Sequence, residues 1–253
     1  YLKYPISDFS FNEEFFEIKI GKNKFNSQGI SLNIDKEKVL LKGDLSFYEI
    51  VPFPRSRLNP GIMGPFSFIS FLECNHEIIN ISEKTKGILN YNGQIIDFNG
   101  GMGYLEKDWG KSFPEWWIWM QSTDFSNHQA SFMLSIAKIP FLGNSFTGFL
   151  AYLKLDGVFY RLATYTGGKI KKLEYQKGKV QIAIEDRKYR LLVSGSYEES
   201  GVLKAPKNGL MSRKISESIT GEIKVSLYDK KGKLIFEDQG ANTGLEIVKE
   251  DAI

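Results

Sequence analysis

Two carboxylic acids stand in a setting that suits acid catalysis. Glu106 and Asp108 lie between a glycine cluster at residues 100–103 and an aromatic segment that begins at Trp116. A carboxyl group held near apolar rings loses hydration, which raises its pKa and favours the protonated form near neutral pH. Acid catalysis is therefore one interpretation of these two residues, and a solvated charged turn is the other.

A third acid, Glu73, follows the apolar run at residues 66–72 and directly precedes Cys74. Its position predicts either a surface residue at the end of a strand or an acid that faces inward. From the residues alone we favour the surface, because charged side chains rarely enter a core without a partner.

All four tryptophans of the chain lie between residues 109 and 119. If residues 116–122 form a strand, alternate side chains point to opposite sides of it. One side then carries Trp117, Trp119 and Gln121, and the other carries Trp116, Ile118 and Met120. We expect one side to join a core and the other to line a pocket. Simple filling between two packed sheets is the alternative.

The residues of several common active sites are missing from the sequence. Only two histidines, His76 and His128, and one cysteine, Cys74, are present, without the close spacing of zinc ligands. We therefore predict no metal site, and we interpret the histidines as structural and Cys74 as a small buried hydrophobe. Residues 110–112 resemble the end of a phosphate-binding loop, but Leu105 occupies the place of its first glycine, and no serine stands in a nucleophile elbow.

The charge balance argues against nucleic acid as a partner. Across 253 residues, 33 basic and 30 acidic side chains give a net charge of +3, and they are dispersed rather than clustered. No run approaches the roughly 18–20 apolar residues of a membrane-spanning helix. A single cysteine excludes an internal disulfide and is typical of a reducing compartment, so we predict a cytoplasmic protein. Peripheral membrane contact and the oligomeric state stay open.

Apolar and polar residues alternate in short runs from end to end, and no long window repeats at helical spacing. The chain is therefore predicted to be all-β with little helix, with strands at residues 66–82 and 116–122 among others. Asn92-Gly93 and Asp156-Gly157 suit the type I′ turns that join antiparallel neighbours. About fifteen short strands are too many for one small barrel. We predict two barrel-like or sandwich-like units, at residues 1–110 and 111–253, divided near the glycine-rich and proline-containing stretch at 100–114.

The densest run of the sequence resembles the EK(N/D)WG…SFP…W(I/F)W(M/V)Q signature of the tocopherol cyclase family. The matching residues are Glu106-Lys107-Asp108-Trp109-Gly110, Ser112-Phe113-Pro114 and Trp117-Ile118-Trp119-Met120-Gln121. Further similarity occurs at residues 60–64, 157–160, 164–166, 203–206 and 244–247. The resemblance thus extends over most of the chain beyond its first fifth.

This family is similar to the carotenoid hydratases, whose Tyr-x-Asp-x-Asn-Trp-Gly motif is echoed by residues 104–110. Glu106 takes the place of the acidic residue in that motif. The resemblance implies two lipocalin-like β units with a cavity for a ligand. The family's aromatic N-terminal segment of the FEGWYF type has no counterpart in this sequence, so we expect the N-terminal unit to lack its first strands.

The family's reaction closes a ring on a prenylated hydroquinone. It needs a proton for an alkene but moves no electrons, so the resemblance implies a cofactor-free isomerase that cyclises or hydrates a prenylated quinol or isoprenoid-type substrate. Glu106 is the implied catalytic acid, with Asp108 or Glu73 as its partner. The implied substrate-binding residues are Tyr104, Trp109, Trp117, Trp119 and Gln121.

Two other classes of protein share parts of this pattern. A lipocalin-like carrier would bind a hydrophobic small molecule without chemistry and would tolerate the loss of Glu106. A tryptophan-rich carbohydrate-binding module would display its rings on an exposed face. The Lys-, Ile- and Asn-rich composition is typical of a bacterial source, which leaves the substrate of such an enzyme open.

Overall fold

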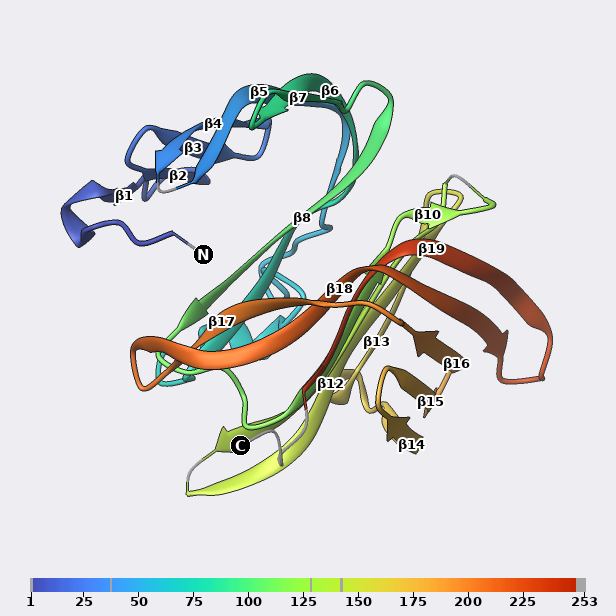
Figure 1. Cartoon of the computed structure of the whole chain (residues 1–253). Helices are drawn as coiled ribbons and strands as arrows, with labels where there is room; N and C mark the ends of the chain where they lie inside the picture. Colours follow the sequence, from blue (N-terminus) through green and yellow to red (C-terminus); the bar gives the residue numbers. More distant parts are fainter. Residues whose placement is uncertain (1, 37, 128, 142, 249–253) are drawn as a thin grey trace. The chain divides into compact units, whose positions relative to one another are not determined.

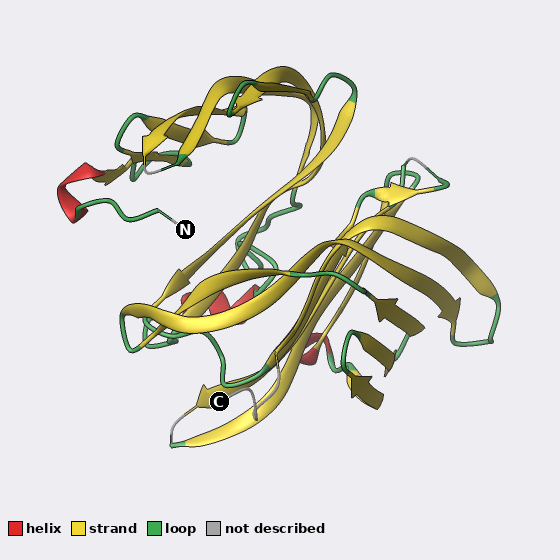
Figure 2. Ribbon diagram, in the orientation of Figure 1, coloured by secondary structure: helices red, strands yellow, loops and turns green. Residues whose placement is uncertain are grey.

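The computed structural model describes residues 2–36, 38–127, 129–141 and 143–248. Strands dominate these residues, and helix is limited to three short 3-10 segments: η1 (Ile6–Asp8), η2 (Gly64–Phe68) and η3 (Thr164–Thr166) (Figure 2). Every strand pairing with a described register is antiparallel, and the strands fall into two large sheets. The predicted all-β fold with two antiparallel units and little helix is confirmed.

The first sheet has eight strands, which pair largely in the order of the chain (Figure 1). Its path consists of β1 (Phe9–Phe11), β2 (Glu17–Ile20), β3 (Asn23–Asn26), β4 (Gly29–Lys36), β5 (Val39–Pro52), β6 (Cys74–Tyr91) and β7 (Gln94–Asp97). The remaining strand, β8 (Gly101–Gly110), pairs with β6. Neighbours in sequence are thus neighbours in space, as expected of strands joined by short turns.

The second sheet has eleven strands and a less sequential order. Along its path lie β13 (Val158–Ala163), β12 (Asn144–Leu155), β11 (Ser131–Phe141), β9 (Trp117–Ser122), β19 (Leu234–Val248), β18 (Leu210–Asp229), β16 (Tyr189–Ser196), β15 (Lys179–Glu185) and β14 (Lys169–Gln176). Two strands lie off this path: β10 (Asp124–Phe125) pairs with β19, and β17 (Gly201–Lys207) pairs with β18. Strand β9 is central, because it pairs with β11 on one side and with β19 on the other.

One apolar core fills the second sheet. Its buried side chains come from strands at both ends of the strand order, including Leu162 of β13 and Ile184 of β15. Because these distant strands share one cluster, the sheet must curve around it in a barrel-like manner. Ile118 and Met120 of β9 belong to this core, which confirms that one side of the aromatic strand faces a core.

The predicted turns form where the sequence indicates them. Asn92 and Gly93 both adopt positive φ, 51° and 90°, between β6 and β7. Asp156 and Gly157 do the same, at 48° and 80°, between β12 and β13. Positive φ at both central residues is the requirement of the type I′ turn.

The predicted strand at residues 66–82 is wrong in its first half. Residues 64–68 form η2, and β6 begins only at Cys74 and continues without interruption to Tyr91. Proline at position 65 pre-sets the backbone for the start of the helix and cannot donate to a sheet. The apolar run therefore does not enter the sheet, and Phe68 and Phe71 are 64% and 60% exposed.

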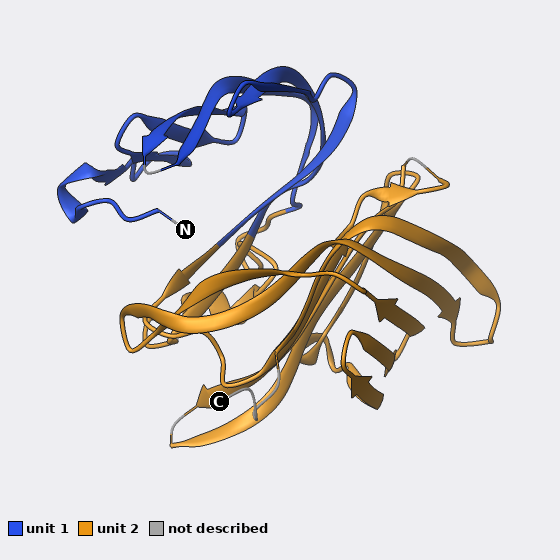
Figure 3. Ribbon diagram, viewed as in Figure 1, with its two compact units in different colours: residues 1–54, 78–107 blue, residues 55–77, 108–253 orange. Residues whose placement is uncertain are grey.

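The chain divides into two compact units (Figure 3). The first contains residues 1–54 and 78–107, and the second contains residues 55–77 and 108–253. The division falls within β6 and β8, and the segment 55–77 joins the second unit. None of the helices among the described residues is long and apolar enough to cross a membrane.

Two segments that carry the family resemblance meet in the second unit. The Tyr165 hydroxyl of η3 donates a hydrogen bond of 2.7 Å to the backbone carbonyl of Ile62, which is fully buried. A side chain at Gly64 would lie 2.6 Å from the Tyr165 ring, and the φ of Gly64 is +55°. The glycine thus allows the ring to close over residues 60–64.

Tyr165→Phe should destabilise the second unit by about 1–3 kcal/mol, because it leaves the buried Ile62 carbonyl without its donor. Urea unfolding measures the change as a lower midpoint at unchanged slope. Tyr91→Phe, which alters a 43% exposed ring, is the control and should change stability by less than about 0.5 kcal/mol. Equal midpoints for wild type and Tyr165→Phe would show that the contact does not hold the segments together.

Candidate functional site

Strand β8 carries the predicted catalytic acid. Tyr104 and Glu106 lie two residues apart on this strand, so their half-buried side chains point to the same side. The Tyr104 hydroxyl donates a hydrogen bond of 2.5 Å to Oε2 of Glu106. Residues 101–110 form a regular strand, which excludes the charged turn as the alternative at Glu106.

Glycines on the other side of β8 bring it close to β6. A Cβ atom at Gly101 would lie 2.7 Å from Oγ1 of Thr85, and one at Gly103 would lie 2.9 Å from Cγ of Glu83. Any larger residue would push the strands or these side chains apart. Because alternate residues face opposite sides, Glu83 and Glu106 lie on opposite faces of the first sheet.

Glu83 is a buried acid that the sequence analysis missed. Its side chain is 2% exposed, and Oε2 has no hydrogen-bond partner among the described residues. Burial raises the pKa of Glu83 to about 7, although a hydrogen bond with Asn80 opposes the rise. The available signal was an acid at the end of the alternating run 78–82, but the predicted strand stopped one residue before it.

Asp108 pairs with a histidine in the second unit. Nδ1 of His76 lies 2.6 Å from Oδ1 of Asp108, and the two side chains are 13% and 28% exposed. The backbone amide of His76 donates to Sδ of Met63 at 3.2 Å, which fixes the start of β6. A histidine nitrogen and a carboxylate oxygen are common metal ligands, so the absence of a metal site stays a prediction. His128, the other predicted structural histidine, lies outside the described residues.

Glu73, the third predicted acid, lies just before β6 and makes contacts of another kind than Asp108 does. The side chain of Glu73 is exposed, while its backbone carbonyl accepts hydrogen bonds from the amides of Lys111 and Ser112. Gly110 makes this approach feasible, since a Cβ there would lie 2.1 Å from the Glu73 carbonyl oxygen. The contacts that Glu73 makes are thus contacts of its backbone, and a role for its carboxylate stays a prediction.

Trp117 is the centre of a second cluster, on the face of β9 opposite the barrel core. Its indole nitrogen donates a hydrogen bond to the carboxylate of Glu246, and the Phe113 ring meets it edge-on at 5.7 Å. The guanidinium of Arg213 lies 4.9 Å from the ring centroid and donates to the carbonyls of residues 114 and 115. Cation–π attraction and these hydrogen bonds hold the indole in one orientation.

The remaining predicted binding residues of β9 lie beside Trp117. Gly244 of β19 pairs with Gln121, and a side chain at Gly244 would lie 2.8 Å from the Trp119 ring. Nε2 of Gln121 is buried and makes no hydrogen bond within the part of the chain that the structure describes. Trp109, at the end of β8, is 45% exposed. The structure thus places a spare amide donor near an indole ring, and the binding roles themselves stay predictions.

The segments that carry the resemblance assemble within the second unit. Residues 244–247 of β19 pair with β9, and the Phe113 amide donates to the carbonyl of Pro206 in β17. Ala205, next to that proline, packs with Trp117 and Ile215. Segments of the resemblance that lie far apart in the sequence thus contact one another in the fold.

These features define an all-β protein of two antiparallel units, with an acid and tyrosine pair on the first sheet and a fixed tryptophan cluster on the second. Residues 33–248 match the family model described as tocopherol cyclase-like. The match spans well over half of the chain, and the protein belongs to this family, as the resemblance predicted.

Two curated relatives are plant proteins. The chain is 25% identical over 197 residues to a protein described as probable tocopherol cyclase, chloroplastic, from Oryza sativa subsp. japonica. It is equally similar to the tocopherol cyclase, chloroplastic, of Zea mays. Each alignment covers 73% of this chain but 41% of the relative, so the chain spans less than half the length of the curated relatives that it matches.

Two solved structures share the fold. Kievitone hydratase from Nectria haematococca superimposes with a TM-score of 0.53 at 16% identity, covering 94% of this chain and 72% of the hydratase. The structure of CghA with Sch210972 gives a TM-score of 0.52 at 9% identity, covering 96% of this chain and 74% of CghA. At such low identity these likenesses concern the fold alone.

Glu83→Gln should remove a pH dependence of stability. The pKa of Glu83 is higher in the folded protein, about 7, than its ordinary value of 4.5, so the folded state holds the proton more tightly. Stability should then fall as the pH rises from about 4.5 to 7, by about 3 kcal/mol in total. Urea unfolding at pH 5 and pH 8 measures this loss, which the neutral glutamine should abolish. Glu13→Gln, at an exposed site, should retain the wild-type dependence.

Cys74 should react slowly in the native protein. Burial raises the pKa of the Cys74 thiol to about 12, and the negative charge of Asp108 adds to the rise. Because the thiolate is the reactive form, we expect modification by a disulfide reagent at pH 8 to be at least about 100-fold slower in native protein than in urea. Asp108→Asn should speed the native reaction only modestly, since burial is the larger cause. Similar rates in native and unfolded protein would contradict this assignment.

Proposed function

We propose that the protein is a cofactor-free enzyme that adds an O–H bond across an alkene, by cyclisation of a prenylated quinol or hydration of an isoprenoid-type substrate. The observation that carries the proposal is the Tyr104–Glu106 pair on β8, which lies within the residues matched to the tocopherol cyclase-like family. The names of the plant relatives support cyclisation, and that of kievitone hydratase supports hydration.

In this reaction Glu106 is the general acid. Tyr104 donates to Oε2, and the proton for the substrate comes from the Glu106 carboxyl group. That proton goes to one alkene carbon, and a tertiary cation forms at the neighbouring carbon. The substrate's phenol oxygen, or a water molecule, then forms the new C–O bond and returns its proton to the Glu106 carboxylate. No electrons are transferred, so the step needs no redox cofactor.

Tyr104 has a positioning role in this scheme. Its hydrogen bond to Oε2 helps to fix the rotamer of Glu106. The half-buried setting of both side chains limits competition from water, which strengthens such a hydrogen bond. Asp108 is committed to His76 at 2.6 Å, so we assign it to support of the strand end rather than to proton transfer.

The contacts of Trp117 and Gln121 indicate which of the two is better suited to bind a substrate. One face of Trp117 is already engaged by Arg213, so this ring is least suited to a second cation. The amide nitrogen of Gln121 is the better candidate for contact with a substrate oxygen, because it lacks a partner within the described ranges. We propose a hydrophobic small molecule as the partner, a cytoplasmic location, and no metal or nucleic acid.

A carrier of hydrophobic molecules is the second candidate. The apolar core inside the curved second sheet supports it, since lipocalin-like carriers are built in this way. A carrier would bind prenylated quinols without converting them, and it would keep its affinity when Glu106 is replaced.

Glu106→Gln tests the acid role. It keeps the shape of the side chain but removes the acidic proton, so turnover should fall about 10²- to 10⁴-fold while binding and melting temperature stay close to wild type. Assays use prenylated quinols and isoprenoid alkenes, with chelator present and without nicotinamide or flavin. Glu13→Gln, an exposed carboxylate of the first unit, is the matched control.

Wild-type turnover by Glu106→Gln would refute the acid role. Tight binding with no conversion by the wild-type protein would favour the carrier. Loss of activity in chelator, restored by one metal, would overturn the metal-free scheme.

A further inference from the structure

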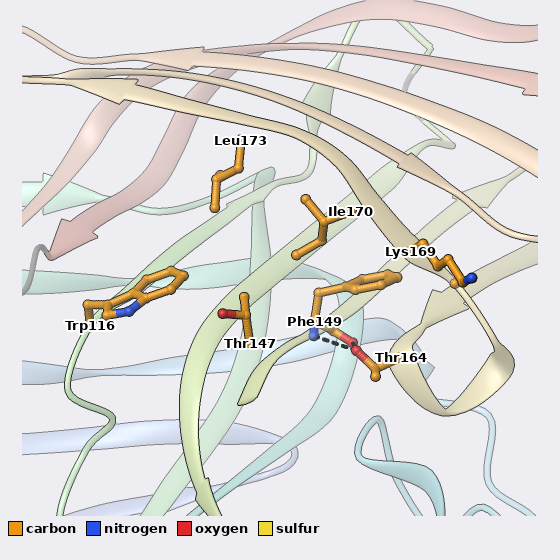
Figure 4. Close-up of a pocket in the computed structure, with 8 residues that line it drawn as sticks. Trp116, Thr147, Phe149, Thr164, Lys169, Ile170 and Leu173 are labelled. Atoms are coloured by element: carbon orange, nitrogen blue, oxygen red, sulfur yellow. Dashed lines mark hydrogen bonds between the residues drawn. The ribbon is translucent and has the colours of Figure 1, made fainter. Parts of the chain in front are cut away.

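A cavity of about 460 Å³ lies in the second unit, and none of the residues assigned above lines it (Figure 4). Its lining includes Trp116, Phe149, Ile170 and Leu173, whose side chains surround the space. Trp116 is the one tryptophan that the sequence analysis does not assign to substrate binding. The volume falls within the roughly 300–1,000 Å³ of typical small-molecule sites.

The cavity is lined by strands from the two ends of the strand order of the second sheet. Phe149 lies on β12 near one end of the order, while Ile170 and Leu173 lie on β14, the last strand at the other end. Strand β14 pairs only with β15 within the described sheet. The curved sheet therefore has a seam between β12 and β14, and the cavity opens at this seam.

A β-bulge aims two apolar side chains of β14 into the cavity. Ile170 pairs with Ile184 and Lys172 pairs with Ala183, so Lys171 is an extra residue in β14. In a regular strand Ile170 and Leu173 would point to opposite faces, because they are three positions apart, but the extra residue changes this. With it, both face the interior, next to the core residues Ile184 and Ile182 that pair with them.

The polar groups of the lining define the kind of ligand. The Thr147 hydroxyl points into the space in Figure 4 and makes no hydrogen bond to another described residue. The Thr164 hydroxyl is occupied by the backbone of Phe149, at 2.9 Å. The amine of Lys169 is directed away from the Trp116 ring. The lining thus offers one hydroxyl without a partner among the described residues, and its one charged group, the Lys169 amine, points away from the Trp116 ring.

We propose that this cavity binds a neutral, flat, apolar molecule with a single hydroxyl or carbonyl group. Its rings would lie among Trp116, Phe149 and Leu173, and its oxygen would bond to Thr147. Recognition of an aromatic body by apolar walls, with one polar group fixing the orientation, is the usual design of such sites. Glu106 is not among the lining residues, and binding at this site requires no catalysis.

The test measures binding of 2-naphthol by calorimetry and by tryptophan fluorescence. Wild-type protein should bind one equivalent, and 2-naphthoate should bind at least about 10-fold more weakly because its charge meets apolar walls. Thr147→Val should raise the Kd about 2- to 10-fold through the lost hydrogen bond. Thr147→Phe, at an exposed position, should fill the space and abolish binding.

Ser145→Phe is the matched control, because Ser145 is exposed on the same side of β12 but does not line the cavity. It should bind 2-naphthol like wild type, as should Glu106→Gln, so the acid role and this cavity can fail independently. Unchanged melting temperatures establish that each variant is folded. The proposal is overturned if wild type does not bind 2-naphthol at 1 mM, if Thr147→Phe binds as well as wild type, or if Ser145→Phe loses binding equally.

Discussion

The burial of both faces of β9 is the constraint on which the second unit depends. One face supplies Ile118 and Met120 to the barrel core, and the other supplies Trp117 to the cluster with Arg213 and Glu246. Such a strand has no solvent side, and both of its edges are paired. Few substitutions are compatible with these demands, which gives a physical reason why the family signature is densest here.

Two acids of the first sheet, Glu106 and Glu83, lie in different surroundings. Glu106 has a tyrosine donor and lies half-buried, whereas Glu83 lies beneath Gly103 with one carboxyl oxygen unsatisfied. Desolvation outweighs the opposing hydrogen bond with Asn80 and favours the neutral acid, so burial raises the pKa at a position with no assigned chemistry. A perturbed carboxyl group is therefore a weaker sign of catalysis than its geometry.

The sequence predicts the fold better than the contacts of the site. Alternation and the turns at Asn92 and Asp156 are local signals, and they sufficed for the all-β class. The predicted strand is wrong at residues 66–72. The apolar residues of this run suggested a strand, whereas Pro65 and the close approach of the Tyr165 ring to Gly64 favour a helical turn. The pairing of His76 with Asp108, 32 residues away, depends on the register of β6 and β8, which no local pattern encodes.

Because of the bulge at Lys171, the shape of one wall of the cavity depends on the number of residues in β14 and not only on their types. Removing a single codon there would take out the bulge and the bend that it gives to β14, while leaving Ile170 and Leu173 on one face and every other strand in register. A lineage could thus alter what this seam accepts in one deletion step, without passing through substitutions in the packed core.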